Sequence, residues 1–219
     1  MASMIAPTAE EFEIYRRVKW YLEDEAIRRL HGYLSPDDSV YAEGDAEVVI
    51  GGPGGPFDDP VVKYEEGYYR AATELVEWAA DRIEAAWTVY PILFVSRHAL
   101  ELSLKKLIVE VFDPVPESVG DQHNIKVLWD MLLKRLQEQC GYAVPLNAKL
   151  ITKVVSQLTE IDAKSMSSRY ATKKDFKTMS MTDPRRLSLR NLQAIVGKLY
   201  NELYNILHTI EEHRRYGTV

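Results

Sequence analysis

The amino-acid sequence predicts an all-α protein, an antiparallel bundle of about six helices with two long loops. Apolar residues recur at helical spacing through several long stretches, most clearly over 91–112 and 188–214. No stretch offers a convincing set of strands. The segments 35–60 and 162–187 lack this periodicity and divide the helical stretches. Short links between the other helices favour antiparallel neighbours.

The N-terminal part of the chain differs in composition from the rest. Thr8 and Glu11 have capping-box spacing, which predicts a first helix ending near Gly32. The following segment is rich in Gly, Pro and Asp and is interpreted as a flexible loop. We therefore expect two parts, a helix with a Gly/Pro-rich loop over 1–61 and a helical bundle over 62–219.

The bundle is expected to contain five helices, each with a recognisable start or stop. Pro91 suits a first helical turn, Gly141 suits a stop, and Ser188 suits an N-cap. The predicted helices span 62–88, 91–112, 123–140, 145–161 and 188–214.

The helix predicted over 91–112 carries charge on two faces. At about 100° per residue, one strip reads as the solvent face, and it contains Ser96, Ser103, Lys106 and Glu110. Roughly opposite, an arc of about 100° contains Arg97, His98, Glu101 and Lys105. Isolated buried charge is very costly, so an inward charged face must be paired, or must line a cleft or an interface.

The net charge, the cysteine count and the distribution of apolar residues argue against several classes of protein. The net charge of −6 argues against tight, non-specific nucleic-acid binding by the whole surface, although a local basic patch remains compatible with it. The single cysteine, Cys140, excludes an internal disulfide and fits a reducing compartment. Neither a secretory signal nor a membrane-spanning run is recognisable. The expectation is a soluble, cytoplasmic protein without a membrane partner.

Other polar residues could join the inward face. His123, at the start of its helix, could meet His98 or Glu101, and Arg169, followed by Tyr170, could pair with Glu101 or with a bound phosphate. Two interpretations stay open for this group. It is either a structural polar network or a reactive or ligand-binding site.

The segment 162–187 holds seven Lys or Arg residues. Lys173 and Lys174 make it the best candidate for a phosphate-contacting patch, and the alternative is a solvated loop. A metal site is a poorer explanation, because the histidines are scattered and Arg97 would repel a cation. No metal or other cofactor is expected.

Aromatic residues recur across the second and third predicted helices. We interpret them as core and interface in preference to a base-stacking platform. They are Tyr64, Tyr68, Tyr69, Trp78, Trp87 and Tyr90.

Three motifs together suggest a family. YPILFVSRHALELSLKKLI, the later HNIKVLW, and EIDAKSMSSRY before a long last helix resemble uncharacterised prokaryotic proteins of the HEPN-like helical superfamily, over about residues 64–210. The resemblance implies a helical bundle that dimerises, common in toxin–antitoxin and anti-phage defence systems. Many such proteins are metal-independent RNases with a composite site at the dimer interface. Their arginine precedes the histidine by a few residues, whereas Arg97 and His98 are adjacent here.

Two functional hypotheses follow. In the first, a HEPN-like defence or toxin–antitoxin protein, a homodimer, cleaves RNA: Arg97 and Lys105 hold a phosphate, and His98 or His123 acts as general base. The second is a non-catalytic interaction or regulatory subunit with a protein partner from the same system. The candidate catalytic residues are Arg97, His98, Glu101 and His123. The candidate substrate-binding residues are Lys105, Arg169, Tyr170, Lys173 and Lys174.

Overall fold

The computed structural model describes residues 60–83, 85–162, 168–170, 177–178, 180 and 186–217. The chain divides into two compact units, Met1–Gly52 and Pro53–Val219, and the described residues all belong to the second. The helix expected from Thr8 and almost all of the loop over 35–60 lie outside the described residues. So do Lys173 and Lys174.

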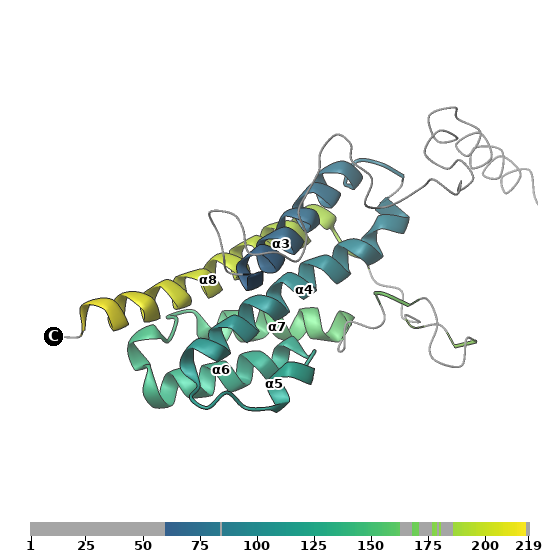
Figure 1. Cartoon of the computed structure of the whole chain (residues 1–219). Coiled ribbons are helices and arrows are strands. Elements are labelled where there is room, and N and C mark those ends of the chain that lie inside the picture. Colours follow the sequence, from purple (N-terminus) through teal and green to yellow (C-terminus); the bar gives the residue numbers. More distant parts are fainter. Residues whose placement is uncertain are drawn as a thin grey trace, which may run out of the picture. The chain divides into compact units, whose positions relative to one another are not determined.

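The all-α prediction is confirmed for the described residues, whose regular elements are all helices (Figure 1). They are α3 (Pro60–Ala79), α4 (Ala85–Val111), α5 (Ser118–Asp121), α6 (Ile125–Gln139), the 3-10 helix η1 (Gly141–Ala143), α7 (Ala148–Ile161) and α8 (Leu189–Tyr216). Over these ranges, no helix combines the length and the apolar character needed to cross a membrane.

The boundary between α3 and α4 differs from the prediction. Helix α3 ends at Ala79, a turn follows, and α4 begins at Ala85, so that Pro91 lies inside α4 and not at its start. A proline within a helix removes a single N–H, the one that would donate to the carbonyl of Trp87. The neighbouring Ile92 is completely buried, so the helix is packed against the core at this point.

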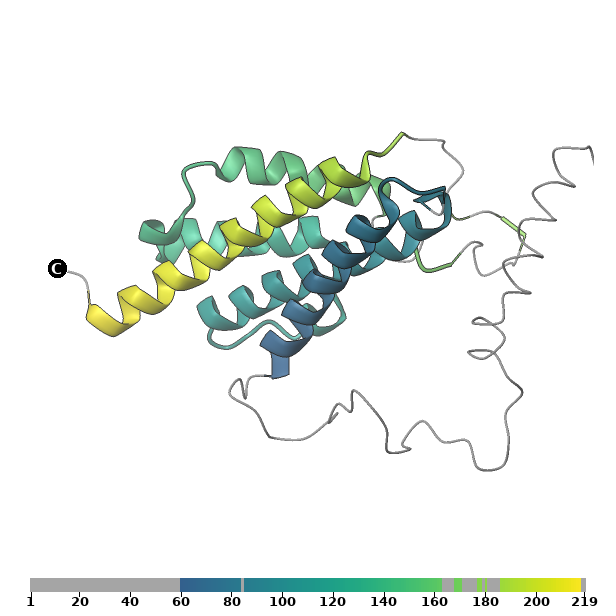
Figure 2. The same ribbon diagram turned by 90° about the horizontal axis from the view of Figure 1, so that it is seen from above.

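Helix α4 is central, since it contacts α3, α6 and α8 (Figures 1 and 2). The predicted solvent strip is therefore wrong: Ser96 and Ser103 are buried, and Lys106 and Glu110 are partly buried. Serine is small enough to let a neighbouring helix approach. The buried hydroxyl of Ser103 also has a hydrogen-bond partner on its own helix, because it donates to the carbonyl of Ala99 at 3.1 Å.

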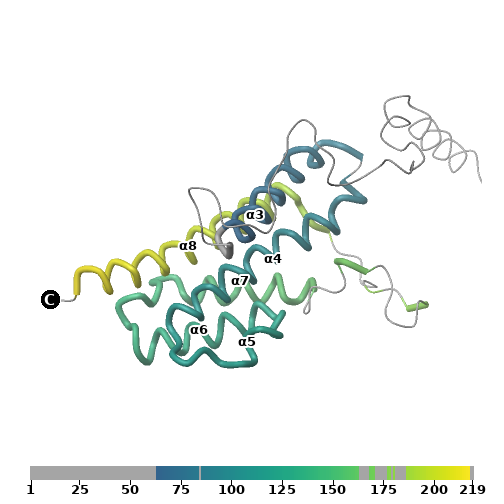
Figure 3. The backbone as a smooth tube through the Cα atoms, viewed as in Figure 1, coloured from purple at the N-terminus to yellow at the C-terminus, as the bar shows by residue number. Residues whose placement is uncertain are grey.

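The antiparallel arrangement holds where the link is short, as in α3–α4 and α6–α7 (Figure 1). Helix α6 instead runs parallel to α4, because the connection over 112–124 returns along α4 before α6 begins (Figure 3). Side chains mark the register at both ends: His123 contacts Glu101, and Arg135 donates to the carbonyl of Val111 at 2.9 Å.

Helix α8 also runs parallel to α4. Near its start, Arg190 bonds to Asp81, just before α4. Near its end, Arg214 bonds to Glu110 at 2.5 Å. The predicted cap is confirmed, because the Ser188 hydroxyl accepts from the backbone N–H of Asn191.

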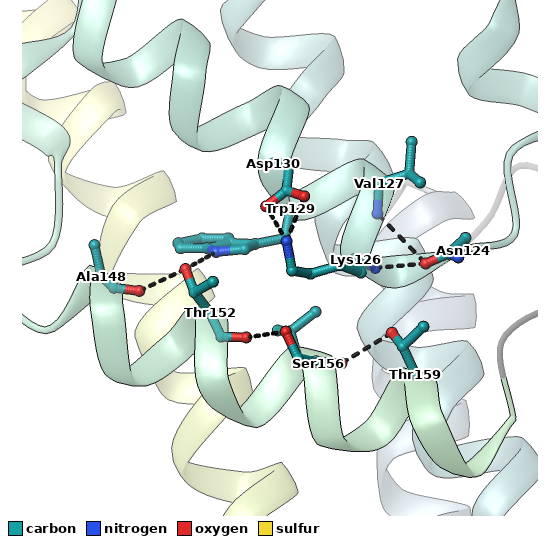
Figure 4. A network of polar contacts seen from close by, with 10 residues as sticks. Asn124, Lys126, Val127, Trp129, Asp130, Ala148, Thr152, Ser156 and Thr159 are labelled. Atoms are coloured by element: carbon teal, nitrogen blue, oxygen red, sulfur yellow. Dashed lines mark hydrogen bonds and ion pairs between the residues drawn. The ribbon is translucent and has the colours of Figure 1, made fainter.

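Polar contacts join α6 to α7 (Figure 4). Asn124 caps α6 by accepting from the backbone N–H groups of Lys126 and Val127. The fully buried Trp129 donates its indole N–H to the Thr152 hydroxyl at 2.8 Å. This bond satisfies the only polar atom of the indole and fixes the start of α6, next to which His123 lies.

Candidate functional site

The prediction that the charged face of α4 lies against protein is confirmed for its two central members. Arg97 is 4% exposed and Glu101 is 1% exposed. The side chains of His98 and Lys105, on the same face, keep some contact with solvent. The face therefore has a buried centre and an open margin.

The Glu101 carboxylate is the centre of this cluster. Its Oε1 lies 2.9 Å from Nδ1 of His123 and 3.0 Å from Nζ of Lys105. Its Oε2 lies 4.0 Å from Nδ1 of His98 and accepts no hydrogen bond within the part of the chain that is described. One buried carboxylate thus faces two imidazoles and an ammonium group, and the expected meeting of His123 with Glu101 is confirmed.

Arg97 fixes the same loop from the other side. Its Nη2 donates to the backbone carbonyl of His123 at 2.9 Å. Burial lowers the pKa of Arg97, while Asp162 and then Glu101 oppose that shift. An arginine stays charged at any ordinary pH, so these carboxylates supply the compensation that a buried cation needs.

Asp162 is a member of the cluster that sequence reasoning missed. It is buried at the C-cap of α7, and its Oδ2 accepts from the backbone N–H and the hydroxyl of Ser168, at 2.9 and 2.6 Å. In the sequence it opens a polar, basic segment, so it reads as an ordinary loop residue. The only signal for it is its position directly after an apolar helical stripe.

Lys105 reaches the return connection as well. Its Nζ donates to the carbonyl of Gly120 at 2.8 Å, in addition to its contact with Glu101. The ammonium group therefore bridges α4 and the segment that leads to α6.

His98 lies between two aromatic rings. The ring of Tyr68, from α3, meets it edge-on with centroids 4.5 Å apart, and the ring of Phe94 stacks on it at 5.6 Å. Burial lowers the pKa of His98. Glu101 opposes this shift, and Arg169, Lys105 and His123 add to it. At neutral pH this imidazole is therefore neutral and able to accept a proton.

Arg169 and Tyr170 lie beside the same rings. The guanidinium carbon of Arg169 is 5.2 Å from the centroid of Phe94 and 5.8 Å from that of Tyr170. The structure thus brings Arg169 of the basic segment onto α4, one turn before His98. Lys173 and Lys174 lie outside the described residues, so their predicted role stays a prediction.

The aromatic stripe, interpreted as core and interface, contributes little to the core of the described residues, and its expected interface role stays a prediction. Only Tyr68 and Tyr69 are half-buried. The other rings are exposed: Tyr64, near the start of α3, and Trp78, Trp87 and Tyr90, near the hairpin of α3 and α4.

Chemically, the cluster is a buried carboxylate that holds the ring of His123 and lies near the ring of His98, and both rings keep contact with solvent. The side chain of His123 is 53% exposed although its Nδ1 is held by Glu101. If Nδ1 carries the proton that it shares with the carboxylate, Nε2 is the nitrogen able to exchange a proton with a bound molecule. Among the described residues, no three His, Cys, Asp or Glu side chains gather as metal ligands would.

The class that fold and site define is an all-α helical bundle with a carboxylate–imidazole cluster on its central helix. In comparisons with known proteins, no family model, no curated protein and no solved structure matches this chain.

Proposed function

We propose that this chain is a HEPN-like helical protein of a prokaryotic defence or toxin–antitoxin system, and that it cleaves RNA without a metal ion. The observation that carries the proposal is the Glu101 carboxylate facing His98 and His123, both of which keep an exposed edge. The resemblance of residues 64–210 to the HEPN-like superfamily supports the biological setting. The single cysteine, Cys140, fits a cytoplasmic location.

The reaction that suits two imidazoles is attack of a ribose 2′-hydroxyl on the adjacent phosphorus. Neutral His98 takes the 2′-hydroxyl proton while the 2′-oxygen forms a bond to phosphorus. The bond to the 5′-oxygen breaks, and His123 gives that oxygen a proton. Glu101 holds Nδ1 of His123, which leaves Nε2 to make this transfer. The products are a 2′,3′-cyclic phosphate and a 5′-hydroxyl.

In this proposal, the buried cation Arg97 and the more exposed cations Lys105 and Arg169 have different roles. Arg97 holds the backbone of His123 from inside the protein, so we assign it to positioning and not to phosphate binding. Lys105 and Arg169 lie nearer the open margin and supply the positive charge that the pentacoordinate phosphorane requires. In the HEPN-like setting, a second copy of the chain completes the site across a homodimer interface.

An RNA-cleavage assay tests the proposal. Wild-type protein is incubated with mixed tRNA and mRNA in EDTA, beside His98→Ala, His123→Ala and Glu101→Gln. Each variant should lose about 100-fold or more of the rate, the usual worth of general acid–base catalysis. His208→Ala is a matched control, because His208 is also 53% exposed and contacts a carboxylate, that of Glu212, but lies on α8. Wild-type-like cleavage by His98→Ala and His123→Ala would contradict the proposal.

A second candidate function is a non-catalytic interaction subunit. The observation in its favour is that Arg97 and Glu101 are buried and bonded to the loop before α6, as a purely structural network would be. Under this hypothesis, the histidine variants lower stability and leave RNA intact. Absence of cleavage products together with a lowered unfolding midpoint would favour it.

A further inference from the structure

The charged face of α4 continues toward the N-terminus of the helix as a line of aromatic side chains. At about 100° per residue, Trp87, Tyr90 and Phe94 fall within the same arc of about 100° as His98 and Lys105. Trp87 is 63% exposed and Tyr90 is 46% exposed, while Phe94 is half-buried beside His98. The line thus begins in solvent and ends at the proposed catalytic imidazole.

Arg169 reaches this line at Phe94. Its guanidinium lies over the ring of Phe94, and its carbon is also 5.8 Å from the centroid of the exposed ring of Tyr170. We call Trp87, Tyr90, Phe94, Arg169 and Tyr170 the aromatic track. A guanidinium among rings provides both a stacking plane and a positive charge that a phosphate can use.

We propose that the aromatic track binds unpaired bases of single-stranded RNA, next to the phosphate that the 2′-hydroxyl attacks. This inference rests on the proposed function. Exposed ring faces stack on any base, and the bases of a duplex are not accessible to them. At 1.5 Å per residue, Trp87 lies about 16 Å from His98 along the helix, the length of a few nucleotides of a single strand.

The charge of the protein supports stacking over simple phosphate attraction. With a net charge of −6, the surface as a whole repels a polyanion. Recognition by base stacking needs few cations, and those near the track, Arg169 and Lys105, lie where the strand would enter the site. RNA bound in this way is selected for being unpaired and not for its sequence.

Fluorescence anisotropy in EDTA tests the track with a labelled single-stranded RNA of mixed sequence whose 2′-hydroxyls are methylated, so that the protein cannot cleave it. Trp87→Ala with Tyr90→Ala should weaken binding by roughly tenfold for each ring removed. Trp87→Phe with Tyr90→Phe keeps the ring faces and should bind nearly as wild type does. The same strand in a duplex should bind more weakly than the single strand. Circular dichroism of each variant checks that the helices are intact.

Tyr204→Ala is the matched control. Tyr204 is exposed, but it lines a hollow with Ser103 and Lys106 on the other flank of α4. Equal affinity of the alanine pair and wild type would overturn the inference. So would a wild type that binds no single strand, or one that prefers the duplex.

A diribonucleotide separates this inference from the catalytic proposal, because it is too short to reach Trp87 from His98. Removing the two rings should therefore slow cleavage of the long strand at low concentration by a larger factor than cleavage of the diribonucleotide. If the histidine variants cleave normally while the alanine pair loses affinity, the catalytic proposal fails and the track stands. If the histidine variants are inactive and the alanine pair binds normally, the inference about the track fails and the catalytic proposal stands.

Discussion

Arg97 is a buried cation whose nearest compensation comes from two carboxylates on different segments, Asp162 and Glu101. Removing the cation leaves both acids buried without it. Arg97→Ala should therefore lower the free energy of unfolding by about 3–5 kcal/mol, and adding Asp162→Asn should recover part of the loss. Urea unfolding of the two single variants and the double variant measures this coupling. Arg70→Ala, which breaks an exposed pair with Glu66, is the control and should change little, and a neutral Arg97→Ala would contradict the assignment.

His98 should make stability depend on pH. Burial lowers its folded-state pKa below the ordinary 6.5, with Glu101 opposing and with Arg169, Lys105 and His123 contributing. The unfolded chain then binds a proton that the folded chain does not, so stability falls as pH drops through about 6.5. His98→Asn should flatten the change in urea midpoint between pH 7.5 and 5.5. If the urea midpoint changes equally with pH in wild type and variant, the pKa of His98 does not differ between the folded and unfolded chain.

Because α4 is central, Ser96 and Ser103 are packing positions, although serine is a polar residue. Both are buried, and a larger side chain would have to displace packed neighbours. Ser96→Leu should cost about 1–3 kcal/mol by overpacking. Val109→Leu, at an exposed position on the same helix, should be nearly neutral and serves as the control. If Ser96→Leu leaves the free energy of unfolding unchanged, Ser96 faces solvent, as the sequence alone suggests.

At the scale of elements, periodicity predicted most of what forms. It identified the core helices and the N-cap of α8, because an apolar stripe with Ser188 before it is a local signal. It placed Arg97 and Glu101 inward correctly, since their angle on the helix does not depend on the neighbours. It failed for Pro91 and for Ser103, because both depend on how many helices surround α4, which no single segment reveals.

At the scale of the whole molecule, the described helices share one hydrophobic core that draws on α3, α4, α6, α7 and α8. Every described member of this core lies within the unit Pro53–Val219. We therefore expect residues 53–219 alone to keep their helical circular dichroism and to unfold in urea in a single cooperative transition. A broad or stepwise transition would show that the first unit is needed for the core.

The parallel arrangement of α4 with α6 and α8 was not predictable from local patterns. It requires that the connection over 112–124 return along α4, and the residues there carry loop signals without direction. The polar contacts of Lys105 and Arg97 with carbonyls of this connection hold it in place. Part of the site therefore exists only because the chain turns back, which explains why its members are distant in sequence.

His123 is held twice from α4, by its backbone carbonyl through Arg97 and by its ring through Glu101. A side chain on a loop normally samples several rotamers, and ordering it on binding costs entropy. Here that ordering is complete when the protein folds, so a molecule that contacts the exposed edge of the ring meets a fixed imidazole. Both bonds join α4 to the residue just before the N-cap of α6, so the ring proton signals of His123 in an NMR spectrum would report how the loop before α6 is docked on α4.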